Sequence, residues 1–193
     1  MPGTNAVPVL QTPRLILRGW RPEDLPPYAA MLADPETACF ITRKGQPYSE
    51  REAWNETVWM IGHWQLLGFG MFIVEERAGG AFLGRVGLLQ PHGWPDLEIG
   101  WALAPAARGR GYATEAARAA VAWAFERFAP ERVVSLIDPR NLASRRVAQR
   151  LGERRTDAQF TPFHIPCDVW ELRREDWRAF TPPAARGRSA PAP

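Results

Sequence analysis

A turn with two glycines joins a strand-like segment to a long helical segment, and this junction constrains the fold more than any other part of the chain. Residues 97–103 (LEIGWAL) read as a strand, and residues 114–128 form an alanine-rich run without Gly or Pro. Gly109 and Gly111 lie between them. We therefore expect a strand, a tight turn and a helix start in that order. Glycine in such a turn lets the backbone approach a ligand closely.

The start of this helix favours an anion. The first backbone N–H groups of a helix have no acceptor within the helix, and they lie at the positive end of the helix dipole. Arg108 and Arg110 add positive charge to the same turn. The sequence therefore predicts a site for a phosphate or a pyrophosphate.

The chain around this turn predicts one mixed α/β domain, because 193 residues suffice for one domain and are too few for two. We expect a disordered lead over residues 1–11, a single domain over residues 12–180 and a disordered tail over residues 181–193. Strands are expected at residues 14–18, 71–74, 82–89, 97–103, 133–137, 154–160 and 167–172.

Helices are expected between these strands. The first begins near residues 21–24 and ends at Asp34, because Pro35 restricts the residue before it. A loop is expected to follow, holding Phe40, Gly45 and Pro47. Later helices are expected at residues 111–128, at residues 142–151 with Asn141 as the cap and Gly152 as the stop, and at residues 173–177.

A capping box marks a further helix. Ser49 and Glu52 have the required spacing, and the helix is expected to run to about Leu66. Its apolar stripe predicts either a core-facing side or a pocket wall, and the core is favoured. The stripe consists of Trp54, Val58 and Ile61.

The charged and metal-binding residue types exclude several functions. The formal net charge is +3 and Lys44 is the only lysine, so we expect a generally basic surface and no nucleic-acid partner. No apolar run has the length of a signal or a membrane span, so we expect a cytoplasmic protein without a membrane partner. Cys39 and Cys167 lie far apart and the three histidines are scattered, so no metal is expected.

Four blocks of the sequence, in order, resemble the GNAT acetyltransferase superfamily. Arg108-x-x-Gly111-x-Ala113 matches its Q/R-x-x-G-x-G/A signature. Residues 98–101 (EIGW) before it and Asn141-x-x-Ser144 after it also fit. Residues 12–24 are similar to the usual opening of the ribosomal-protein N-terminal acetyltransferase subgroup. The match spans residues 12–178.

The resemblance implies an α/β (α+β) fold whose mixed, mostly antiparallel central sheet is splayed between the fourth and fifth strands and flanked by helices. It also implies acetyl-CoA as co-substrate and direct transfer of the acetyl group to an amine. By resemblance, the backbone N–H groups of the turn would hold the CoA pyrophosphate, and these belong to Arg108, Gly109, Arg110, Gly111, Tyr112 and Ala113. The pantetheine arm would be held by Leu103 and Ala104 at the strand end and by Asn141.

Two residues are candidates for the chemistry of transfer. Glu98 lies on the strand beside the expected thioester, and partial burial would raise the pKa of its carboxyl toward that of a working general base. Two other roles stay open for Glu98, namely pairing with an arginine and binding the substrate amine. Ser144 either donates a proton to the leaving thiolate or bonds the backbone in the first turn of its helix.

The acceptor is expected to meet the first two helices, the loop between them and the turn at residues 161–166. This region is aromatic, which favours either an apolar acceptor pocket or ordinary packing by Phe40, Tyr48, Trp54, Trp59 and Trp64. An α-amine with a pKa of about 8 is roughly a tenth neutral at pH 7, whereas a lysine amine is only about 0.04% neutral. A protein N-terminus or a small-molecule amine is therefore an easier acceptor than a lysine.

A second class of function competes with catalysis. A GNAT-type module that has lost activity could bind acyl-CoA as a sensor, and the glycine turn alone does not separate this from an enzyme. Retention of Glu98 and Ser144 favours the enzyme. A homodimer is left open.

Overall fold

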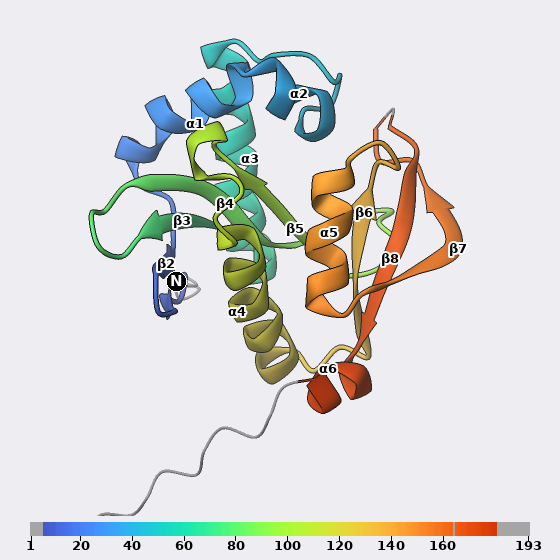
Figure 1. Ribbon diagram of the computed structural model, residues 1–193. Helices are drawn as coiled ribbons and strands as arrows, with labels where there is room; N and C mark the ends of the chain where they lie inside the picture. The colour runs from blue at the N-terminus through green and yellow to red at the C-terminus, as the bar shows by residue number, and fades with distance from the viewer. Residues whose placement is uncertain (1–5, 164, 181–193) are drawn as a thin grey trace, which may run out of the picture.

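Eight strands form one open sheet in the computed structural model, which describes residues 6–163 and 165–180 (Figure 1). The order along the sheet is β1-β2-β3-β4-β5-β6-β8-β7. Neighbouring strands are antiparallel except for β5 and β6, which are parallel. The strands are β1 (Leu10–Gln11), β2 (Leu15–Arg18), β3 (Met71–Glu76), β4 (Phe82–Leu89), β5 (Glu98–Leu103), β6 (Arg132–Ile137), β7 (Arg154–Phe160) and β8 (Cys167–Arg173).

The expected mixed, mostly antiparallel sheet is confirmed, with one addition at its edge. Leu10 and Gln11 were placed in a disordered lead by the sequence, but they form β1 and pair with β2. Residues 1–5 and the tail at 181–193 lie outside the described residues, so the prediction of disorder there stays a prediction.

Six helices flank the sheet within the described residues: α1 (Leu25–Ala33), α2 (Pro35–Ile41), α3 (Glu50–Leu67), α4 (Tyr112–Arg127), α5 (Leu142–Leu151) and α6 (Arg174–Phe180). Short 3-10 turns precede α1 (η1, Pro22–Asp24) and α4 (η2, Pro105–Ala107). In Figure 1, α4 and α5 lie next to each other on one face, while α1, α2 and α3 gather at one end and behind the sheet. None of the helices in the described ranges is long and apolar enough to span a membrane.

Alternating residues of the central strands build separate cores on the two faces of the sheet, as the period of two in a strand requires. On one face, Phe72, Val86 and Ile99 are fully buried in a cluster with the small residues of α4. On the other face, Met71 packs with Met60 of α3. This second face also carries Arg85, Glu98 and Gly100 toward α1–α3, and it provides the floor of the site described below.

The sheet splits between β5 and β6. Their register is recorded at one position, Glu98 opposite Val134, with a hydrogen bond from Val134 N to Leu97 O of 2.9 Å. Beyond this point the two parallel strands diverge, and the edge of β5 faces a gap. These are the fourth and fifth strands of the sequence prediction, which did not include β1, so the predicted splay is confirmed.

The prediction of a loop after Asp34 is wrong for the first half of that segment, because residues 35–41 form the helix α2. The Asp34 carboxylate accepts a hydrogen bond from Thr37 N at 2.9 Å and caps the new helix. Pro35 occupies its first position, where the missing N–H removes no hydrogen bond. The Asp-Pro pair therefore ends α1 and also begins α2. Gly45 and Pro47 do lie in the loop that follows.

The predicted capping box of α3 is confirmed, whereas the expectation that its apolar stripe faces the core is wrong. The Ser49 side chain accepts from Glu52 N, and the Glu52 carboxylate accepts from Ser49 N. Trp54, Val58 and Ile61 are 54%, 47% and 41% exposed. The buried face of α3 consists of Ala53, Thr57, Met60, His63 and Trp64. Because α3 carries apolar side chains on two faces, periodicity did not identify the covered one.

Candidate active site

The glycine turn has the backbone conformation that the sequence predicts. Gly109 and Gly111 have φ values of +75° and +79°, a region that favours glycine. Gly111 is the N-cap of α4, and no side chain caps the helix there. Among the described residues, the backbone N–H groups of residues 109–113 have no acceptor. These free donors fit a pyrophosphate. Arg108 N–H differs, because it already donates to Pro105 O at 3.2 Å.

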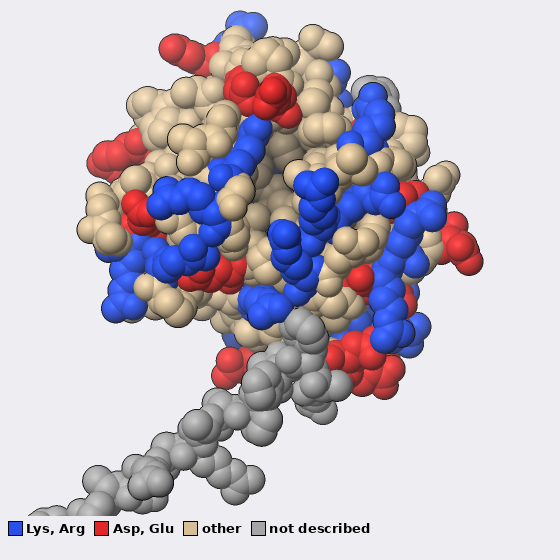
Figure 2. Space-filling view, viewed as in Figure 1, with Lys and Arg blue, Asp and Glu red and all other residues tan. Residues whose placement is uncertain are grey.

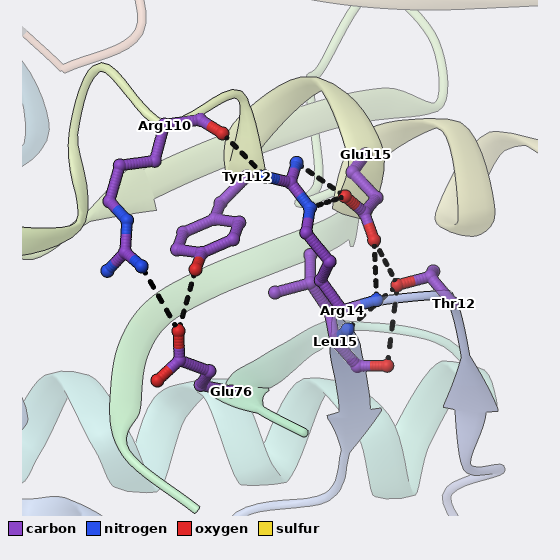
Figure 3. A network of polar contacts seen from close by, with 7 residues as sticks. All are labelled: Thr12, Arg14, Leu15, Glu76, Arg110, Tyr112 and Glu115. Carbon is purple, nitrogen blue, oxygen red and sulfur yellow. Dashed lines mark hydrogen bonds and ion pairs between the residues drawn. The ribbon is translucent and has the colours of Figure 1, made fainter. Parts of the chain in front are cut away.

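Glu115 fixes the position of this turn relative to β2 (Figure 3). Its carboxylate accepts hydrogen bonds from Thr12 Oγ1 at 2.6 Å and from Arg14 Nε at 2.7 Å. Arg14 Nη1 in turn donates to Arg110 O at 2.9 Å. Burial alone would raise the pKa of Glu115, but the hydrogen bonds from Thr12 and Arg14 lower it below its usual value. Glu115 therefore links the start of α4 to the segment before β2, and its negative charge is also favourable in the first turn of the helix.

Tyr112 anchors the other side of the same turn (Figure 3). Its hydroxyl donates to the Glu76 carboxylate at 2.7 Å, and the guanidinium groups of Arg14 and Arg110 each lie 4.7 Å from its ring centroid. The side chain is 3% exposed. Tyr112 therefore packs between two cations, which leaves its backbone N–H to face a ligand.

The Arg108 side chain joins the turn to the second helix instead of pointing into an anion site. Its Nε donates to Leu103 O at 3.2 Å, and its Nη2 donates to Thr37 Oγ1 and to Asp34 Oδ2. Basic side chains nevertheless gather on both sides of a hollow in this face of the molecule (Figure 2). The hollow lies between the turn side and the α5 side, so an anionic ligand would meet positive charge from both.

The split in the sheet exposes backbone groups at the end of β5. Ala104 N donates to Leu83 O of β4 at 2.9 Å, so this end is paired on its β4 side. The opposite edge of β5, beyond Ile99, has no strand beside it because β6 has diverged. An unpaired strand edge can hydrogen-bond an extended, amide-bearing ligand. Leu103 and Ala104 therefore lie where the expected pantetheine arm could run.

Asn141 and Ser144 lie across the gap from β5, at the start of α5. Asn141 Oδ1 accepts from Ser144 N at 3.0 Å, which confirms the predicted helix cap and leaves the Asn141 amide N–H groups available. Trp101 of β5 donates from Nε1 to Ser144 Oγ at 3.2 Å. The Ser144 hydroxyl thus accepts from an indole, and its own proton can go to another group.

A cavity of about 130 Å³ occupies the gap. Its floor is the face of β5 that carries Glu98 and Gly100, and its walls come from α2, α3, the end of β6 and the loop before β8. Both catalytic candidates, Glu98 and Ser144, line this one cavity together with Asn141. The structure therefore brings together the residues that the sequence selected from separate motifs.

Glu98 is the titratable group at the centre of the split. Burial raises the pKa of its carboxyl to about 7, although the Trp94 indole, the Arg85 charge and the Leu136 backbone N–H each oppose the shift. The Trp94 Nε1–Glu98 Oε2 distance is 2.6 Å. A carboxyl with this pKa is about half ionised at neutral pH, which suits a group that accepts and releases protons. Of the roles left open by the sequence, direct pairing with an arginine is not observed among the described residues.

A second buried carboxyl, Glu153, lies at the base of the gap. It is 4% exposed, and burial raises its pKa to about 8. Ser135 Oγ lies 2.9 Å from Glu153 Oε1 and 2.8 Å from Ile99 O. A hydroxyl has one proton, so both contacts are satisfied when a protonated Glu153 donates to Ser135 and Ser135 donates to Ile99 O. Glu153 is therefore a neutral acid at neutral pH.

Aromatic rings close the outer side of the cavity. Trp94 stacks edge-on with Phe163, with ring centroids 5.7 Å apart. The Arg43 guanidinium lies 4.7 Å from the Phe163 ring centroid and 5.2 Å from that of Trp59. Arg43 thus joins the segment after α2 to the loop before β8 across the opening.

The predicted acceptor region is only partly correct at the level of single residues. Phe40 and Trp59 line the cavity, whereas Trp64 is buried in the main core and Trp54 faces solvent. Tyr48 packs against the small core that surrounds Tyr28. Aromatic content alone did not separate these residues, because each occurs in a helix or loop whose covered face depends on tertiary contacts.

Three residues that line the cavity were not selected from the sequence, namely Arg85, Trp94 and Ser135, and neither was Glu153, which contacts Ser135 from behind. Arg85 and Ser135 lie within apolar strands, where an isolated polar residue is a usable signal, since a buried polar side chain needs a partner. Glu153 directly follows the helix-stopping Gly152 and has no comparable local signal.

Comparison with known proteins identifies the matching family. A family model described as "Acetyltransferase (GNAT) domain" matches residues 14–154. The uncharacterized protein YkkB of Bacillus subtilis (strain 168) is 32% identical over 151 residues, which cover 77% of this chain and 86% of YkkB.

Two solved structures show the same arrangement of elements. The acetyltransferase from Agrobacterium tumefaciens str. C58 superposes with a TM-score of 0.77 at 30% identity, covering 88% of this chain and 96% of the other. The spermidine N-acetyltransferase from Vibrio cholerae, solved with CoA and spermine, superposes with a TM-score of 0.70 at 16% identity, covering 86% and 99%. At that identity the second likeness shows the fold alone.

Proposed function

The chain belongs to the GNAT acetyltransferase family, and from this premise we propose that it transfers the acetyl group of acetyl-CoA directly to a primary amine, with Glu98 as the general base. The chain is thus an acyltransferase that uses an amine acceptor. The observation that carries the proposal is the half-buried Glu98 carboxyl at the split of the sheet, which lines the cavity and whose pKa of about 7 matches a proton acceptor at neutral pH.

Backbone groups are proposed to hold the coenzyme. The N–H groups of residues 109–113 would bind its pyrophosphate at the positive end of α4, supported by the absence of any acceptor for them among the described residues. The free edge of β5 at Leu103 and Ala104 and the amide of Asn141 would hydrogen-bond its pantetheine arm. When bound, acetyl-CoA supplies an activated acetyl thioester. Arg108 contributes by positioning the turn, since both its N–H and its side chain already have partners.

Glu98 is proposed to take the proton from the attacking amine, directly or through a water. An amine attacks only in its neutral form, so a carboxylate at the cavity floor raises the reactive fraction. Trp94 orients that carboxylate through the 2.6 Å hydrogen bond to Oε2. Oε1 lies 3.6 Å from the position that a Cβ on Gly100 would occupy, so it points along the cavity floor toward Gly100, beside the Met71 methyl group.

The pH dependence tests this proposal. With an acceptor whose amine pKa is far from 7, kcat/KM is expected to rise as pH increases through about 7, because Glu98 accepts a proton only when ionised and its pKa is raised to that value. The measurement is initial rates of free-thiol release across the pH range. A limb that moves with the pKa of each acceptor, and shows no component near 7 common to all of them, would contradict the assignment.

Ser144 is proposed to give a proton to the leaving thiolate. The Trp101 indole donates to its oxygen, so the hydroxyl proton is directed to another acceptor. Ser144→Ala is expected to lower kcat by about tenfold, less than loss of the base, because a thiol pKa of about 8.5 makes the thiolate a good leaving group. If the variant keeps its circular dichroism spectrum and its single-turnover kinetics match the wild type, Ser144 has only a structural role in the first turn of α5.

The acceptor is proposed to present an α-amine or another weakly basic primary amine, as a protein N-terminus or a small molecule does. A larger fraction of such amines than of lysine side chains is neutral at neutral pH, so Glu98 has to deprotonate a smaller fraction of the bound acceptor. An acyl-CoA sensor without catalysis would bind acetyl-CoA tightly and release no thiol with any amine, and this outcome would replace the proposal.

A further inference from the structure

Arg85 places a buried positive charge at the floor of the acceptor cavity. The side chain lies on β4, is 6% exposed, and lines the same cavity as Glu98. Its Nε donates to Tyr28 Oη at 3.0 Å, and burial raises the pKa of Tyr28 to about 12, so that hydroxyl stays neutral. No described residue accepts a hydrogen bond from the two Nη nitrogens of Arg85.

The carboxylates around Arg85 attract it without pairing with it. Glu56 and Glu98 both favour its charged form through space, yet neither lies within ion-pair distance. Asp138, the other acidic residue of the cavity lining, is held by Arg140 through Nη2 at 2.6 Å and Nε at 3.0 Å. A buried guanidinium normally satisfies its planar fork with a carboxylate or a phosphate. In this cavity the protein supplies no such partner.

Arg85 and Glu98 lie on the same face of the sheet and line one cavity. Residues 98, 100 and 102 of β5 project to the same face as residues 85, 87 and 89 of β4, by the register of the pair. Positions 87 and 100 are both glycine, and the Met71 side chain lies over Gly100, with its Cε 2.9 Å from where a Cβ would stand. The floor between the two charged groups is therefore apolar. A ligand on this floor meets Glu98 at one end and Arg85 at the other.

We propose that the acceptor carries an anionic group, in the form of a carboxylate close to its reactive amine, and that Arg85 binds this carboxylate. This rests on the proposed function, because the amine must reach Glu98. An amino-acid-like zwitterion matches the two charges of the floor, whereas a polyamine would bring a second positive charge toward Arg85. A cavity of about 130 Å³ also fits a small acceptor, since a cavity of about 150 Å³ holds a ligand the size of benzene.

The test compares matched acceptors with acetyl-CoA: α-amino acids with apolar side chains, their carboxamides, and spermidine. Thiol release is followed at about pH 8.5, where Glu98 is ionised in every variant. The wild type is expected to prefer each amino acid over its carboxamide by about 100-fold in kcat/KM. The amine of a carboxamide is less basic and more often neutral, so amine reactivity alone would give the opposite order. Dipeptide amides beginning with Glu or Gln show whether the carboxylate can come from a side chain.

Three variants separate recognition from folding. Arg85→Met removes the charge and keeps most of the aliphatic stem, and it is expected to reduce the preference for the carboxylate to about onefold, with acetyl-CoA affinity within about twofold of the wild type. Arg85→Lys retains the charge without the planar fork and should restore part of the preference. Tyr28→Phe removes the protein partner of Nε and should leave the preference in place. Arg85 also lowers the pKa of Glu98, so Arg85→Met should shift the acid limb to higher pH.

The outcomes are distinct. Equal or faster turnover of carboxamides or spermidine by the wild type, or a preference that survives in Arg85→Met, overturns the role of Arg85 and leaves the acetyltransferase activity intact. A preference for Glu over Gln at the first position of the dipeptides supports a carboxylate near the amine from a peptide source. Absence of thiol release with every acceptor refutes the proposed function and this inference with it.

Discussion

Replacing Glu98 by Gln is expected to lower kcat by about 100- to 10,000-fold, with acetyl-CoA affinity within about twofold of the wild type. Glutamine has the same shape, and its side-chain oxygen can still accept from the Trp94 indole. It cannot accept a proton from the amine at neutral pH. The measurement is steady-state thiol release with a saturating amine, combined with calorimetric titration of acetyl-CoA.

The pH profile of this variant separates loss of a base from loss of position. The limb near pH 7 should disappear in Glu98→Gln, because the group whose pKa is raised to about 7 is gone. Glu153→Gln is a matched control in the same gap: Glu153 is protonated at neutral pH, so the change removes little charge, and kcat should stay within about threefold. Retention of the pH 7 limb in Glu98→Gln would show that another group is the base.

Gly111→Val is expected to weaken acetyl-CoA binding by about 10- to 100-fold. Gly111 has a φ of +79°, where a β-branched residue is strained by about 1–3 kcal/mol. The nearest atom to an added Cβ is Arg14 Nη2 at 3.5 Å, an ordinary contact, so the effect comes from the backbone and not from a clash. Relief of the strain would rotate the free N–H groups of residues 109–113 away from a shared anion. Calorimetry with acetyl-CoA measures the loss.

Gly80→Val is the control for this variant. Gly80 has a φ of +70°, and an added Cβ there meets no atom within 4 Å. It lies in the turn between β3 and β4, so the strain should lower stability without changing affinity for acetyl-CoA. Equal affinities of Gly111→Val and the wild type would remove the turn from the binding site. Asn141→Asp, which can keep the helix cap but lacks the amide donor, tests the pantetheine contact in the same titration.

Most of the fold could be predicted from the sequence because the residues that begin and end its helices act through local backbone conformation and local hydrogen bonds. Gly111 and Gly152 mark a helix start and a helix end through conformations that other residues rarely adopt, and Ser49 with Glu52 forms a box that needs no tertiary contact. A local signal can also have two meanings, as Asp34-Pro35 shows. The pair suits both the end of one helix and the first turn of the next, and the sequence alone favoured only the first.

The donor side of the site was also accessible from the sequence, because the glycine turn, Glu98 and Asn141-x-x-Ser144 each belong to a short motif. The structure brings Glu98, Asn141 and Ser144 to one cavity. The acceptor side was less accessible. The importance of Arg85 and Glu153 is visible only from their burial and from the groups near them in the folded chain. The helix α3 carries apolar residues on both a covered face and an exposed one, so the sequence did not show which of them line the cavity.

The free N–H groups of the glycine turn have a consequence for how this protein can diverge. Every residue type except proline carries a backbone N–H, so a donor site built from them tolerates changes of side chain as long as the two glycines keep their φ values. The acceptor cavity is built from side chains, including Arg85, Trp94 and Phe163, and each is open to replacement. Selection can therefore alter the acceptor by single substitutions while the donor stays the same. Variant libraries limited to the cavity lining should yield new acceptor preferences far more often than new donor preferences.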